Sequence, residues 1–158
     1  MLRELQTILN KNVDAQYKAG ADMVTGMGVV KNFTNKTADL PSAETAEGIF
    51  FVNKERIPTG INTARAEMSD YDDDFVKIVE GEFVKLITPL AGEVYGTDQY
   101  VSTGLQVGDA MSVETNGKWK KAGTGIVSRF VYTGTYNDNG KVLARIEVTA
   151  KAKTNSNS

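Results

Sequence analysis

The group of residues most able to bind a metal ion is a cluster of four carboxylates, Asp70, Asp72, Asp73 and Asp74. Alternate aspartates of this kind can present carboxylate oxygens to Ca²⁺. A calcium loop of the EF-hand type also requires glycine at its sixth position and glutamate at its twelfth, where this chain has Phe75 and Gly81. We therefore predict an acidic loop that binds no metal ion.

Catalytic chemistry has few other candidates, because the chain contains no cysteine and no histidine. This composition excludes disulfides, zinc sites built from Cys or His, cysteine nucleophiles and histidine bases. A small hydrolase with paired carboxylates remains an alternative, and the candidate carboxylates are Glu80, Glu82, Glu93 and Asp98. Each of them also falls where the solvent face of a strand is expected. We predict no enzymatic activity, no catalytic residues and no cofactor.

The charge of the chain argues against a polyanionic partner. Its 158 residues include 18 basic and 20 acidic side chains, with a net charge of −2, and the densest basic group is Lys118, Lys120 and Lys121. Nucleic-acid-binding domains usually carry a basic face, so we predict no nucleic-acid partner, although an OB-like module remains an alternative. No window approaches the roughly 20 apolar residues of a membrane span, and residues 1–20 do not resemble a secretory signal. We expect no membrane association. We expect the protein to be assembled in a cytoplasm.

The chain is long enough for one domain with an arm at either end. Residues 1–20 are predicted to form a short helix, because Leu2, Leu5, Ile8, Leu9 and Val13 recur at helical spacing. A helix of this length needs a surface to lie against. That surface is either the chain's own core or a neighbouring subunit. Residues 151–158 are predicted to form a disordered tail.

Residues 21–150 are predicted to form a small β-barrel or sandwich, because short apolar or alternating segments are separated by turn residues. The strands are expected near residues 24–30, 48–53, 75–80, 82–88, 93–101, 110–114, 118–122, 125–132 and 141–150. Asn116-Gly117 is typical of a two-residue type I′ hairpin, and a second hairpin is expected to turn through residues 137–140. Trp119, Phe130 and Ile146 are predicted to lie in the core.

Residues 54–74 have little periodicity and contain a Pro-Thr-Gly turn. A loop of this length is uncommon inside a compact domain and is often an interaction surface. We therefore predict that a partner is bound through this loop and the N-terminal stripe. The predicted contact residues are Leu2, Leu5, Ile8, Leu9, Arg56, Ile57, Ile61 and Arg65.

Several segments of the chain resemble those of tailed-bacteriophage capsid decoration (cement) proteins. They are Ile57-Pro58-Thr59-Gly60-Ile61-Asn62, Ser69-Asp70-Tyr71-Asp72, Gly81-Glu82-Phe83-Val84 and Leu105-Gln106-Val107-Gly108-Asp109. The turns Gly108-Asp109 and Asn116-Gly117-Lys118 are also similar to those of this group. The resemblance covers residues 48–149 and lies in the general character of the sequence instead of in a diagnostic motif. The N-terminal segment has no counterpart in this group.

The resemblance implies a structural virion protein that binds the outer surface of a phage head and stabilises it. Its expected partner is the major capsid protein, and its expected state is a homo-oligomer, with a trimer favoured. A tail or head-completion component is the alternative within the same class. No functional residue is transferred from the resemblance.

Overall fold

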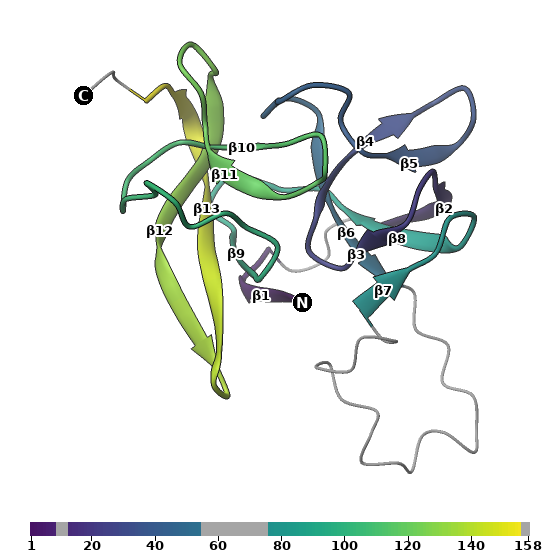
Figure 1. The fold of residues 1–158 in the computed structure, drawn as a ribbon, viewed down its shortest axis with the longest axis horizontal. Coiled ribbons are helices and arrows are strands. Elements are labelled where there is room, and N and C mark those ends of the chain that lie inside the picture. Colours follow the sequence, from purple (N-terminus) through teal and green to yellow (C-terminus); the bar gives the residue numbers. More distant parts are fainter. Residues whose placement is uncertain (9–12, 55–75, 156–158) are drawn as a thin grey trace.

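The computed structural model describes residues 1–8, 13–54 and 76–155, and their fold is mostly β, as predicted. Figure 1 shows two neighbouring groups of strands. The first group contains β2 (Val13–Ala19), β3 (Met23–Val24), β4 (Gly28–Asn32), β5 (Thr37–Asp39), β6 (Ile49–Lys54), β7 (Lys77–Ile78) and β8 (Phe83–Ile87). The second contains β1 (Leu2–Gln6), β9 (Val94–Thr97), β10 (Met111–Val113), β11 (Trp119–Lys121), β12 (Ser128–Asp138) and β13 (Lys141–Lys153).

Five strands of the first group close into a barrel in the order β2-β5-β4-β6-β8. Strands β2 and β5 run parallel, and the other neighbouring strands are antiparallel. Apolar side chains fill the interior, and Val29, Val52 and Leu86 are completely buried there. A small barrel filled in this way is a packed core.

Strand β6 belongs to the barrel and also packs against the second group, so it is buried on both faces. Val52 belongs to the barrel core, whereas Ile49 and Phe51 belong to the core shared with the sheet β1-β9-β13-β12. Successive side chains of a strand point to opposite faces. A strand covered on both sides therefore needs a continuous apolar run, and residues 49–52 supply one.

An aromatic cluster fills the shared core. The ring of Phe51 stacks on those of Tyr95 and Trp119, with centroid distances of 4.4 and 4.7 Å, and Trp119 meets Phe130 edge-on at 4.7 Å. Trp119, Phe130 and Ile146 are all buried in this cluster, which confirms the predicted core positions.

Both predicted hairpins are present, but the type I′ geometry lies in the second one. Strands β12 and β13 are joined by Asn139 and Gly140, which both have positive φ (51° and 93°), as a type I′ turn requires. Between β10 and β11 only Gly117 has positive φ, and its N–H bonds to the Glu114 carbonyl. The predicted two-residue turn at Asn116-Gly117 is therefore wrong, and a longer turn with glycine at its last position replaces it.

The predicted N-terminal helix is also wrong. The segment forms β1, which pairs with β9, and β2, which closes the barrel between β5 and β8. These pairings satisfy backbone groups of β9 and β8 that a helix would leave open. An isolated helix of this length is marginal in water, so long-range strand pairing outweighs the local periodicity.

Part of the predicted disordered tail, residues 151–155, is ordered. Strand β13 continues to Lys153, and the side chain of Asn155 accepts a hydrogen bond from Ala110 N and donates to the carbonyls of Ala110 and Ala122. Residues 156–158 lie outside the described part of the chain. The same holds for residues 55–75, which include most of the predicted interaction loop.

Candidate functional site

The N-terminal ammonium group is held inside the fold. It donates hydrogen bonds to the Thr25 carbonyl (3.0 Å) and to Asp98 Oδ1 (2.5 Å), and the Met1 residue is only 2% exposed. Lys141 Nζ lies 2.8 Å from the other oxygen of Asp98, and Gln99 donates to Oδ1. One carboxylate thus fixes the start of β1 and the turn end of the β12–β13 hairpin.

Burial and pairing act against each other in this cluster. Burial lowers the pKa of the Met1 ammonium below its ordinary value of 8.0, although Asp98 acts to raise it. Burial acts to raise the pKa of Asp98, but the hydrogen bonds from Lys141, the ammonium and Gln99 outweigh it and hold that pKa below 3.8. Burial therefore destabilises the charged form of the ammonium group, and the interaction with Asp98 is the main effect that stabilises it.

Asp98→Asn is expected to lower the free energy of unfolding by about 2 kcal/mol, because charge-assisted hydrogen bonds to buried groups are lost. The unfolded chain binds more protons than the folded one between the folded pKa of the ammonium and 8.0, so stability rises with pH in this window. Removing Asp98 lowers the folded pKa further and steepens that rise. Urea denaturation at a series of pH values below 8.0 measures both effects.

The control for this prediction is Asp14→Asn, which removes the more exposed Asp14–Lys31 pair. This variant should lose less than about 1 kcal/mol, as surface pairs do, and should keep the parent's pH dependence near 8. The contribution of Asp98 to the free energy of unfolding is complete above pH 3.8. It is lost as the pH falls through the lowered pKa that Asp98 has in the folded protein. Equal losses in the two variants would contradict a special role for Asp98.

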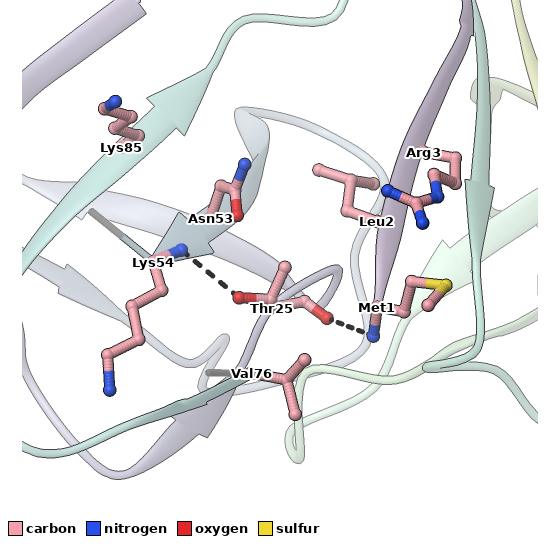
Figure 2. Close-up of a pocket in the computed structure, with 8 residues that line it drawn as sticks. All are labelled: Met1, Leu2, Arg3, Thr25, Asn53, Lys54, Val76 and Lys85. Carbon is pink, nitrogen blue, oxygen red and sulfur yellow. Dashed lines mark hydrogen bonds between the residues drawn. The ribbon is translucent and has the colours of Figure 1, made fainter. Parts of the chain in front are cut away.

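A pocket of about 260 Å³ lies between β1 and the barrel, beside this cluster (Figure 2). Its lining consists of Met1, Leu2, Arg3, Thr25, Asn53, Lys54, Val76 and Lys85. Figure 2 shows Thr25 at the centre, where its carbonyl accepts from the Met1 ammonium and its hydroxyl oxygen accepts from Lys54 N. Three cationic side chains and no carboxylate line the pocket, so it suits an anionic group.

The cations of the pocket also have structural partners. Arg3 Nε lies 2.6 Å from Asp138 Oδ2, and Lys54 Nζ donates to the Lys77 carbonyl at 2.7 Å and lies 3.6 Å from Glu82. An anion in this pocket would therefore share these side chains with the fold. The geometry supports recognition of a charged surface group more than tight binding of a small molecule.

The structure brings together parts of the two predicted contact regions. Leu2 lines the pocket with Lys54 and Val76, the described residues on either side of 55–75. Leu5 packs over Gly96, where its Cδ1 lies 3.5 Å from the position of an added Cβ, and Ile8 is 48% exposed. Leu9, Arg56, Ile57, Ile61 and Arg65 lie outside the described residues. Leu2 and Leu5 thus pack on their own chain instead of forming a free stripe.

Three of the four candidate carboxylates for hydrolysis have separate structural roles. Glu93 is fully buried and accepts hydrogen bonds from Tyr95 OH, Leu90 N and Ile8 N. Glu82 accepts from Val79 N, and Asp98 pairs with the ammonium. Among the described residues there is no group of side chains that could hold a metal ion, and the aspartate cluster lies outside them.

Sequence reasoning missed Arg3, Asn53 and Lys85 as pocket residues. Asn53 and Lys85 are opposite each other on β6 and β8, and Arg3 comes from a strand of the other sheet. Lys85 is the one polar residue of β8, and Asn53 follows the apolar run of β6, which is the local signal that they carry.

Comparisons with protein-family models, with curated proteins and with solved structures return no match for this chain. Within the described residues, no helix is long and apolar enough to span a membrane.

Proposed function

We propose that the chain is a structural virion protein without enzymatic activity, which binds the outer surface of a phage capsid and stabilises it. Its partner is the major capsid protein, and it acts as a homo-oligomer, with a trimer favoured, assembled in the host cytoplasm. This proposal starts from the resemblance to decoration proteins in the segments between residues 48 and 149.

The observation that carries the proposal is the rigid construction of the described β core. Strand β6 is packed on both faces, the N-terminal ammonium is held inside, and no buried side-chain polar atom of the described residues lacks a hydrogen-bond partner. A protein that clamps its neighbours benefits from rigidity, because less of its binding energy is lost in ordering its own chain. Repetition over a capsid surface then adds avidity.

A tail or head-completion component would share these properties and remains the alternative within the class. One observation favours the OB-like alternative: a closed five-stranded barrel in which Lys18 Nζ lies 5.2 Å from the ring of the exposed Phe83. Single-stranded nucleic acids bind to exposed aromatic rings beside basic side chains. The Tyr17 ring, however, which Lys31 and Lys36 approach, is 5% exposed and unavailable for stacking.

Co-sedimentation with empty capsids of the phage that encodes the chain tests the proposal. The protein is expected to pellet with expanded heads in a saturable, fixed ratio, and to raise the temperature at which the heads break. Titration with single-stranded DNA at two salt concentrations is the parallel measurement. Absence from the capsid pellet, together with salt-dependent DNA binding, would overturn the structural role in favour of the OB-like alternative.

A further inference from the structure

An apolar groove lies between the start of β6, the start of β12 and the end of β13. It consists of two connected cavities of about 310 and 150 Å³, which share Ala46, Gly48 and Arg129. Phe50 and Pro89 line one end, and Val127 and Ala152 line the other. We call this feature the Arg129 groove. It lies at the opposite end of β6 from Lys54 and therefore away from the cationic pocket.

The groove combines apolar walls with one cationic side chain, that of Arg129. Val127 is 52% exposed, and Leu90, which follows Pro89, is 36% exposed, so apolar surface continues to the rim. Arg129 is exposed and has no ion pair within the described residues. The one carboxylate in the lining is Glu47, which forms no ion pair with Arg129. The electrostatic complement of this groove is a carboxylate carried beside an apolar side chain.

The backbone of β13 offers a second element of recognition. Its bonds on the β9 side end at Val148, which accepts from Gly92 N and donates to the Glu93 carbonyl. Strand β13 continues to Lys153, and Ala152 lines the groove. Beyond Val148 this edge of β13 has no backbone partner in the described part of the chain. An extended segment can add to such an edge as a further strand, with its side chains directed into adjacent pockets.

We propose that the Arg129 groove receives an extended segment of the major capsid protein, which carries a carboxylate next to an apolar side chain. The segment lies along the free edge of β13, its apolar side chain enters between Phe50 and Val127, and its carboxylate pairs with the guanidinium of Arg129. This inference rests on the proposed function and adds to it the contact surface and the chemistry of the contact.

The test compares Arg129→Glu with Arg129→Lys and with a matched control, Arg145→Glu, in capsid co-sedimentation over a range of protein concentrations. Arg145 is also exposed, but it lies on β13 and lines neither cavity of the groove. Arg129→Glu should weaken binding at least tenfold, Arg129→Lys should weaken it less, and Arg145→Glu should bind like the parent. Val127→Asp, on the same groove, should weaken binding independently of Arg129.

All four variants change exposed side chains, so their melting temperatures should stay within a few degrees of the parent's. If Arg129→Glu and Val127→Asp both bind as tightly as Arg145→Glu, the groove is not the contact, while the proposed function stands. If the parent itself does not bind capsids, the proposed function fails and this inference fails with it.

Discussion

Gly26→Ala is expected to lower the free energy of unfolding by about 3–5 kcal/mol, which combines backbone strain with overpacking. Gly26 has a φ of 97°, and an added Cβ would lie 2.4 Å from Thr97 Oγ1 and 2.7 Å from the Met1 carbonyl oxygen. The backbone cannot move away without loss, because the Gly26 carbonyl accepts hydrogen bonds from Trp119 Nε1 (3.1 Å) and Thr97 Oγ1 (3.0 Å). Chemical denaturation followed by Trp119 fluorescence measures the change.

Gly125→Ala is the matched control, because Gly125 also has positive φ (83°) but an added Cβ would meet no atom within 4 Å. This control should lose only about 1 kcal/mol, the cost of the backbone conformation. A Gly26 variant as stable as the Gly125 variant would mean that the contact between β1, β9 and the turn at Gly26 adapts easily.

The mostly-β class and the main core positions could be predicted from the sequence because their signals are local. The apolar run at 49–52 and the alternation through 82–88 reflect which faces of β6 and β8 are covered. Trp119, Phe130 and Ile146 lie at the positions of their strands that the alternation assigns to the core. The assignment of the type I′ turn failed because two Asn-Gly pairs are present, and only the strand register selects between them.

The N-terminal strands could not be predicted because their formation depends on distant residues. Leu2 and Leu5 follow helical spacing, yet the first pairs with Thr97 in the strand register and the second packs over Gly96. The parallel pair of β2 and β5 likewise has no local signature. Such pairings depend on the whole topology, and local propensity is only a weak guide to them.

The candidate sites show the same limit. Lys54 and Val76 mark the ends of the segment that the sequence singled out, but the pocket also requires Arg3 from the edge of the other sheet. The Arg129 groove is built from residues around 46–50, 88–89, 127–130 and 152, which no spacing rule connects. Surfaces between two packed sheets are formed by tertiary structure, so a sequence can suggest which residue types form them but not where they lie.

Phe51→Ala is expected to lower the free energy of unfolding by about 3–5 kcal/mol, the usual cost of truncating a buried phenylalanine. Its ring is completely buried and contacts Tyr95, Trp119 and Phe130, so the substitution opens a cavity where the barrel meets the second sheet. The loss should appear as a lower denaturation midpoint together with a changed near-ultraviolet spectrum, because the stacking of Trp119 is removed.

Phe33→Ala provides the control of equal size, since Phe33 is 72% exposed in the turn between β4 and β5. The free energy of unfolding of the Phe33→Ala variant should stay within about 0.5 kcal/mol of the parent's. The comparison also tests how the two strand groups depend on each other. A single cooperative transition in Phe51→Ala, seen equally by Trp119 fluorescence and by far-ultraviolet dichroism, would show that barrel and sheet unfold together. Two separated transitions would contradict a common core, and would mean that the barrel retains its fold after the shared aromatic cluster is lost.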